Sequence, residues 1–430
     1  MLQTRGYKYE LRVNNKERTR LTQCAGIAGF AWNWGLANRL HRYKANTGDA
    51  RYTDAMKQHK LLNSLKKTEF LWMYEASKCI PQEALRNLDQ AFQKFFKTRK
   101  AAKSSGRGQR IGFPRFKKKS KAKESFRLTG AIKVFPKTKR VQLPRLGQLR
   151  IKETPHLASS ARILSATVSR TADKWYVAFT VEEEHSEPNN CYETVVGVDA
   201  GLVRFSTLST GWVIPKPVFL LKRLKKLRRL SKAHSWKQPG SNNRRKSANK
   251  LAKFYHQIAN TRKDFQHKLS LQLVKNHDVL VVEDLYVKGL MKNKHQSRHW
   301  ADLAHGEFQR MLTYKSKKYG KLLVEADHWF PSSKLCSNCL MIHRNLMLKD
   351  RIFCCPFCGL TIDRDYNAAL NLAQYFYQFI RSQVIQLSTV ASSSDETLNA
   401  CEETVRPVSM QARHDEAGRQ ALPKTGHKRP

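Results

Sequence analysis

The spacing of apolar residues changes several times along the chain, and each change predicts a different kind of element. Residues 5–12 alternate between apolar and polar positions, which predicts a strand. From about residue 17 to residue 100, apolar residues recur at intervals of three and four, and Gly and Pro are scarce. This spacing predicts three or four helices. The basic residues 101–125, which are punctuated by Gly and Ser, predict a loop.

Between residues 126 and 182 the pattern changes to short runs rich in β-branched and aromatic residues, which predict strands. We place these strands at 141–147, 163–169 and 175–181. Residues 171–174 predict a hairpin turn between the last two. With the strand at 5–12, these elements predict a small β-barrel into which a helical module is inserted. The polar residues 182–190 predict the main domain boundary.

Strands and helices alternate in the second half of the chain. Two buried runs, 194–199 and 278–283, each end in an acidic residue and predict strands. Further strands are expected at 204–209, 212–214 and 321–325, and helices at 221–277 (broken at 238–243), 305–319 and 366–379. Two hairpin connections followed by alternating elements predict a mixed sheet flanked by helices. Beyond about residue 385 the chain is rich in Ser, Thr and charge, which predicts disorder.

The composition narrows the class of protein. The chain has 430 residues, 80 of them Lys or Arg and 34 Asp or Glu, which gives a formal net charge of +46. Hydrophobic residues make up 40% of the chain, enough to build cores, which excludes a wholly disordered basic tail protein and a collagen-like chain. We expect two to four domains at this length. Because so large a charge repels itself unless a polyanion neutralises it, nucleic acid is the leading candidate partner.

The positive charge is concentrated in two blocks. Residues 101–150 hold 16 Lys or Arg and one acid, and residues 201–250 hold 14 and no acid. A charge run is often only a solvated face, but here apolar and aromatic residues interrupt both blocks, which favours folded basic surface. The candidate nucleic-acid contacts are Arg115, Lys117, Lys118, Lys119, Arg244, Arg245 and Lys246.

The chain has no run of about 18 apolar residues, so we expect no membrane span. Residues 1–10 lack the apolar core of a secretory signal. Nine cysteines, five of them within 23 residues, do not resemble a secreted disulfide framework. We therefore expect the chain to act in a reducing cytoplasm.

Four of the clustered cysteines have the spacing of a zinc site. Cys336 and Cys339 form one C-x-x-C pair and Cys355 and Cys358 a second, with 15 residues between the pairs. Two such pairs can place four thiolates at the corners of a tetrahedron around one structural Zn²⁺. Cys354 is an alternative ligand, although the spacing favours Cys355. The competing interpretation is a set of buried or redox-active thiols.

Three acidic residues form a second candidate site. Asp199 and Glu283 each end a predicted strand, and Asp363 and Asp365 precede the helix at 366–379. Carboxylates that converge in a basic protein repel one another unless cations lie between them, so these acids predict a magnesium site. Two ions there could hydrolyse a phosphodiester. Taken singly, each acid could instead have a role that involves no metal. Asp363 or Asp365 could cap the helix, and Asp199 could be a loop acid.

These segments resemble a known family. Residues 197–202, 281–285 and 363–369 resemble the three motifs of a RuvC-like nuclease domain, and residues 332–339 with 355–359 resemble a zinc ribbon inserted before the third motif. Residues 112–116, 143–147, 174–177 and 260–268 also resemble the family's first half and its long helix. The chain thus resembles, over roughly residues 5–378, the TnpB (OrfB) family of transposon-encoded, RNA-guided DNA endonucleases, which are related to type V CRISPR effectors.

The resemblance implies an Mg²⁺-dependent DNA endonuclease in the prokaryotic cytoplasm, associated with the nucleoid. Asp199, Glu283 and Asp365 would be its catalytic, metal-binding acids, since the family's third acid directly precedes an x-Asn-Ala-Ala run. Its partners would be a guide RNA from the transposon end and double-stranded target DNA beside a short motif. Two other functions stay open: a transposase that uses the same acids, and a nuclease-inactive regulator that binds RNA and DNA.

The patterns and the resemblance together predict a multidomain α+β and α/β protein. The expected parts are a wedge β-barrel at 1–15 and 104–185, a helical recognition module at 16–103, a RuvC-like (ribonuclease-H-like) domain at 191–330 and 360–384, a zinc ribbon at 331–359 and a disordered tail at 385–430. Two positions depart from the family pattern. Leu340 stands where the family commonly has Gly, and residues 361–362 stand where a His is frequent.

Overall fold

The computed structural model describes residues 2–45, 53–105, 111–119, 122–157, 161–184, 192–347 and 349–380. The predicted tail at 385–430 lies outside these residues. The chain divides into two compact units. The first comprises residues 1–189 and 218–266, and the second comprises residues 190–217 and 267–430.

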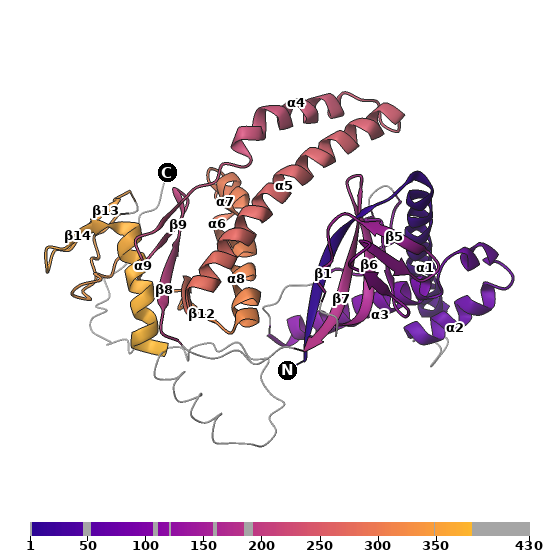
Figure 1. Cartoon of the computed structure of the whole chain (residues 1–430), viewed down its shortest axis with the longest axis horizontal. Coiled ribbons are helices and arrows are strands. Elements are labelled where there is room, and N and C mark those ends of the chain that lie inside the picture. Colours follow the sequence, from indigo (N-terminus) through magenta and orange to yellow (C-terminus); the bar gives the residue numbers. More distant parts are fainter. Residues whose placement is uncertain are drawn as a thin grey trace, which may run out of the picture. The chain divides into compact units, whose positions relative to one another are not determined.

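The first unit is built on one antiparallel sheet of seven described strands, in the order β2-β6-β7-β1-β5-β4-β3. Figure 1 labels β1, β5, β6 and β7 of this sheet. Along β7, every second residue from Trp175 to Val181 is buried, because successive side chains of a strand point to opposite faces. The strands are β1 (Leu2–Arg12), β2 (Ser125–Leu128), β3 (Lys133–Phe135), β4 (Arg140–Leu143), β5 (Gly147–Ile151), β6 (Arg162–Thr171) and β7 (Lys174–Glu184).

One prediction for this sheet is not confirmed and another is wrong. The described strands pair in a row whose outer members are β2 and β3, so the predicted small β-barrel is not confirmed. The single strand predicted at 141–147 is instead a hairpin of β4 and β5. Pro144 has no N–H to donate to a ladder, and Arg145 after it takes a φ of 65°. Leu146 N–H then donates to the Leu143 carbonyl at 3.1 Å, which closes the turn.

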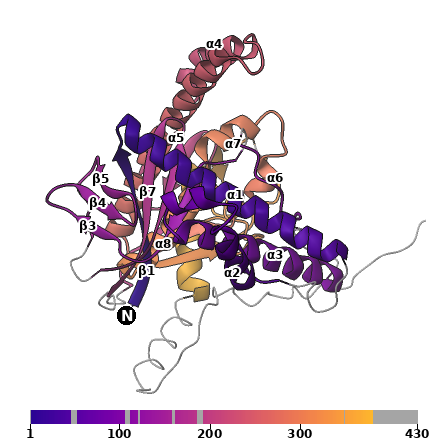
Figure 2. The same ribbon diagram turned by 90° about the vertical axis from the view of Figure 1, so that its right-hand side faces the viewer.

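Of the three or four helices predicted, the described part of residues 15–105 contains three, α1, α2 and α3, which Figure 2 labels. The helix α1 (Asn15–Ala45) begins at a capping box, in which Asn14 Oδ1 accepts from Glu17 N–H and Asn14 N–H donates to the Glu17 carboxylate, both at 2.8 Å. The other two are α2 (Ala55–Leu65) and α3 (Cys79–Ser105). Since α3 continues to Ser105, the loop predicted at 101–125 starts later than expected.

Buried residues of α1, among them Leu21, Cys24 and Ile27, pack in one cluster with sheet residues such as Val177 and Phe179. The same unit contains a helical hairpin, in which α4 (Leu224–Ser235) and the first part of α5 (Asn242–Asn276) run side by side (Figures 1 and 2). Leu227, Phe254 and Ile258 join the two helices. This hairpin matches the helical region predicted at 221–277 with a break at 238–243. No helix among the described residues is long and apolar enough to span a membrane.

The second unit is built on a mixed sheet, as predicted. Its five described strands lie in the order β10-β9-β8-β11-β12. Strand β8 (Val195–Ala200) pairs in parallel with β11 (Val279–Glu283), which pairs in parallel with β12 (Leu322–Ala326). Strands β9 (Arg204–Leu208) and β10 (Val213–Pro215) add to β8 as an antiparallel hairpin. The remaining elements are α6 (Val287–Leu290), α7 (Ser297–Leu303), α8 (His305–Tyr319), β13 (Ile352–Cys354), β14 (Thr361–Asp363), α9 (Arg364–Tyr375) and a π-turn, η4 (Phe376–Ile380).

The helix α9 lies directly on β8, as Figure 1 also shows, because a glycine on this strand leaves room for it. A Cβ atom on Gly197 would lie 2.6 Å from the Ala373 nitrogen and closer still to the Ala369 carbonyl oxygen. Backbone atoms cannot move aside as the end of a side chain can. Gly197 therefore sets the distance between the sheet and α9.

Replacing Gly197 by alanine should lower the free energy of unfolding of the second unit by about 1–3 kcal/mol or more, because the added methyl overpacks a close backbone contact. Gly26 in α1 provides the matched control, since a Cβ there meets nothing within 4 Å. Gly26→Ala should stabilise α1 by up to about 1 kcal/mol. Urea denaturation of both variants measures the difference, and an equal effect of the two substitutions would contradict this role for Gly197.

Candidate active site and metal centre

Two of the three predicted acids lie at the ends of neighbouring parallel strands. Gly197 of β8 is in register with Val281 of β11. Two residues further along, Asp199 and Glu283 point to the same side as these residues, since side chains alternate along a strand. Gly197 faces α9, and Val281 packs in a cluster with Leu372 of α9. Both carboxylates therefore lie on the face of the sheet that α9 covers.

The third acid comes from the first turn of α9. Asp363 is the N-cap of this helix, and its Oδ1 accepts from the N–H groups of Asp365 and Tyr366, both at 3.1 Å. Asp363 also pairs with Arg204 at 2.9 Å. The capping role thus belongs to Asp363, which leaves the Asp365 carboxylate available to interact with the other two acids.

The three carboxylates act on one another electrostatically. Asp199 is 8% exposed, and its pKa is raised well above the ordinary value by burial and then by the charges of Glu283 and Asp365. The pKa of Glu283 is also raised, first by burial, and Asp365 adds to the effect. Arg364 Nη2 lies 3.5 Å from Asp365 Oδ1 and opposes the shift at Asp199.

The residue types of these three acids are those that favour a divalent cation. Among the described residues, no basic side chain forms an ion pair with Asp199, although the chain carries a large excess of positive charge. Buried carboxylates that repel one another are stabilised when a cation lies between them. Carboxylate oxygens are also the protein ligands that Mg²⁺ prefers.

The four predicted zinc ligands also meet. The sulfur atoms of Cys336, Cys339, Cys355 and Cys358 all lie within 4.8 Å of one another. The Sγ atoms of Cys336 and Cys358 are 3.6 Å apart, and those of Cys339 and Cys355 are 3.5 Å apart. Tetrahedral Zn–S bonds of about 2.3 Å require S–S separations of about 3.8 Å, so the arrangement fits one zinc ion. Cys354 is exposed and is not part of the group.

The two C-x-x-C segments fold into the same turn. Leu340 N–H donates to the Cys336 carbonyl at 3.0 Å, and Gly359 N–H donates to the Cys355 carbonyl at 3.1 Å. The equivalent residues Leu340 and Gly359 both have positive φ, 60° and 74°. Glycine adopts this conformation without strain, whereas leucine does not. With Leu340 in place of the glycine common in the family, the turn therefore keeps its shape but is less stable.

Comparisons with known proteins cover most of the chain. Family models described as "Helix-turn-helix domain", "Probable transposase" and "Cas12f1-like, TNB domain" match residues 1–48, 178–294 and 305–372. A protein of Streptomyces pristinaespiralis named "Putative RNA-guided DNA endonuclease" is 33% identical over 370 residues, which are 86% of this chain and 88% of that protein. The chain belongs to the TnpB (OrfB) family. A second TnpB relative, InsQ of Escherichia coli K12, carries the same description and is 29% identical over 388 residues, 86% of this chain and 92% of its own length.

A solved structure shows the same overall fold. The Cas12f1 chain of a complex with sgRNA and target DNA matches 86% of this TnpB chain and 99% of its own length, with a TM-score of 0.51 and 14% identity. The helix-turn-helix description does not fit the local structure, because residues 2–45 form one strand, β1, and one long helix, α1.

The predicted nucleic-acid contacts of this TnpB chain have different surroundings. The Lys117 ammonium lies 4.1 Å from the centre of the Trp32 ring, whose N–H donates to the Arg115 carbonyl. Arg244 donates to the Lys237 carbonyl and so closes the α4–α5 turn. Lys118 and Lys119 are exposed. Trp32 therefore holds the first basic segment against α1.

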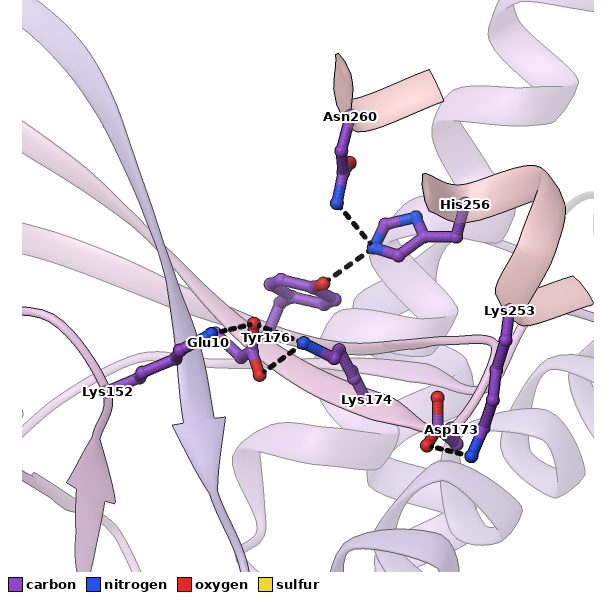
Figure 3. A network of polar contacts seen from close by, with 8 residues as sticks. All are labelled: Glu10, Lys152, Asp173, Lys174, Tyr176, Lys253, His256 and Asn260. Atoms are coloured by element: carbon purple, nitrogen blue, oxygen red, sulfur yellow. Dashed lines mark hydrogen bonds and ion pairs between the residues drawn. The ribbon is translucent and has the colours of Figure 1, made fainter. Parts of the chain in front are cut away.

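A polar network holds the basic helix α5 against the first unit's sheet (Figure 3). Lys253 pairs with Asp173 at 2.7 Å, and His256 Nε2 meets the Tyr176 hydroxyl at 2.8 Å. Asn260 Nδ2 also lies 3.2 Å from His256 Nε2. An amide nitrogen can only donate, so Nε2 accepts in this contact. Burial and then Lys174 lower the pKa of His256.

The sequence interpretation missed one residue beside the acids. Ser332, which is 4% exposed, donates from its hydroxyl to Glu283 Oε1 at 2.5 Å. Ser332 lies in the segment that precedes Cys336 and carries no spacing signal of its own. Only the folded path of this segment brings it to the end of β11.

Proposed function

We propose that this chain is an RNA-guided DNA endonuclease that cuts phosphodiesters at a RuvC-like site formed by Asp199, Glu283 and Asp365. The observation that carries the proposal is geometric: Asp199 and Glu283 extend from paired strands on the face that α9 covers, and Asp365 lies in the first turn of α9. Membership of a family whose relatives are named RNA-guided DNA endonucleases, over 86% of the chain, supports it. The net charge of +46 fits polyanionic partners.

The three acids would hold two Mg²⁺ ions, which when bound would activate water and neutralise charge that develops on the phosphodiester. The chain itself fixes where the acids lie. Asp199 and Glu283 extend from paired strands, and Asp363 fixes the first turn of α9, from which Asp365 extends. Burial of Asp199 limits the access of bulk water to the cluster.

The four-cysteine group would hold one structural Zn²⁺, because four protein ligands leave no open position for a substrate. The proposed partners are a guide RNA from the transposon end and double-stranded target DNA. The two basic blocks supply surface for their phosphates, while pairing between RNA and DNA would supply sequence specificity.

The function is tested by co-expressing the chain with the DNA that flanks its gene and sequencing the RNA that co-purifies. The RNA-bound protein is then given a matching plasmid with randomised sequence beside the target. We expect broken plasmid only when matching RNA and Mg²⁺ are both present, and a short motif beside the broken targets. Joined DNA products would favour the transposase, and tight binding without Mg²⁺-dependent breaks would favour the regulator.

A further inference from the structure

The segment that leads into the first C-x-x-C pair also contacts the proposed active site. We propose that Ser332 is a positioning residue that fixes the Glu283 carboxylate for metal binding, and that α9 holds Ser332 in place through two buried asparagines. The proposal rests on the proposed function of the three acids and adds a residue that acts through Glu283.

The Ser332–Glu283 hydrogen bond selects one orientation of a flexible side chain. A glutamate carboxylate has several acceptor positions and three rotatable bonds that lead to it. The Ser332 hydroxyl donates to Oε1 at 2.5 Å, which is short for a hydrogen bond between two oxygen atoms. Because Ser332 is 4% exposed, bulk water does not readily replace it. The bond leaves Oε2 free to act as a ligand.

The backbone of Ser332 is itself held by α9. Asn371 Nδ2 donates to the carbonyls of Ser332 at 2.8 Å and Leu335 at 2.6 Å. Asn367, one turn earlier on the helix, donates to the Leu335 carbonyl at 2.6 Å and accepts from Ser337 N–H at 3.0 Å. Both asparagines are 0% exposed.

These contacts join three features of the second unit. The helix α9 carries Asp365 in its first turn and packs on β8, the strand of Asp199. The same helix also forms hydrogen bonds to the residues on both sides of Cys336, a predicted zinc ligand. A change in the path of this segment would therefore move Ser332 and release the Glu283 carboxylate.

The experiment replaces Ser332 by alanine in the full-length protein. Binding of Mn²⁺, a stand-in for Mg²⁺, is measured by titration calorimetry on the RNA-free chain, with Asp199→Asn as the background of other Mn²⁺ sites. We expect Ser332→Ala to weaken Mn²⁺ binding by about 10–100-fold and to lower kcat for DNA cleavage by a similar factor, with KM for target DNA unchanged. Ser332→Thr keeps the hydroxyl and should restore most of both.

Zinc content and the unfolding temperature separate positioning from a purely structural role. Both should stay at wild-type values in Ser332→Ala. Ser333→Ala, in the same segment, is the matched control and should change nothing. Wild-type Mn²⁺ binding and kcat in Ser332→Ala would overturn the proposal, as would losses accompanied by equal losses of zinc and stability. If the wild-type protein cuts no DNA but Ser332→Ala still weakens Mn²⁺ binding, the positioning role stands and the proposed function fails.

Discussion

Asp199→Asn should abolish DNA cleavage and leave binding of guide RNA and target DNA intact. Asn keeps the volume of the side chain, so the buried position stays filled while one anionic ligand is lost. Bound metal ions supply several kcal/mol of transition-state stabilisation, and each 1.36 kcal/mol is tenfold in rate. The cleavage rate should therefore fall about 10³-fold or more, measured in single-turnover reactions with RNA-loaded protein.

The two acids at the start of α9 provide a control within a single turn. Asp365→Asn should match the loss in Asp199→Asn, because both residues belong to the proposed metal site. Asp363→Asn should retain most cleavage, since an asparagine N-cap can still accept the N–H groups that Asp363 Oδ1 accepts. Full activity of Asp365→Asn combined with no activity of Asp363→Asn would assign the third ligand to Asp363 instead.

The arrangement of Asp199 and Glu283 could be predicted because it follows from local pattern. Each residue directly follows a buried run, and buried runs of this length form parallel strands in the middle of a sheet. The acids at such strand ends lie side by side once the strands pair. The cysteine group could also be predicted from the sequence, because the spacing of two C-x-x-C pairs almost determines which sulfur atoms come together.

Features that depend on the path of loops could not be predicted in this way. The contact of Ser332 with Glu283 joins residues 49 positions apart through a segment without regular structure. The contact between Lys117 and Trp32 likewise joins a loop residue to a helix residue that lies 85 positions earlier in the chain. Closure of the predicted barrel depended on how outer strands pair, and strand patterns alone do not specify partners.

Cys336→Ser should remove the bound zinc and strongly destabilise the second unit. The segment that carries the four cysteines is too short to build a large apolar core, and its fully buried cluster consists of Cys336, Cys355 and Phe353. Zinc held by the four sulfur atoms would supply the missing stability. Structural zinc sites contribute roughly 10–16 kcal/mol of apparent binding free energy to folding. The loss of even part of this should lower the unfolding temperature of the second unit by about 10 °C or more.

Cys354→Ser is the matched control, because Cys354 adjoins the predicted ligand Cys355 but is exposed and outside the sulfur group. It should retain one zinc per chain by metal analysis and unfold at the wild-type temperature. Since Asn367 and Asn371 join the Cys336 segment to α9, the loss of zinc should also loosen that helix. A Cys336→Ser protein that keeps one zinc, or that lacks zinc and unfolds like the wild type, would show that the four sulfurs do not support the fold through a metal.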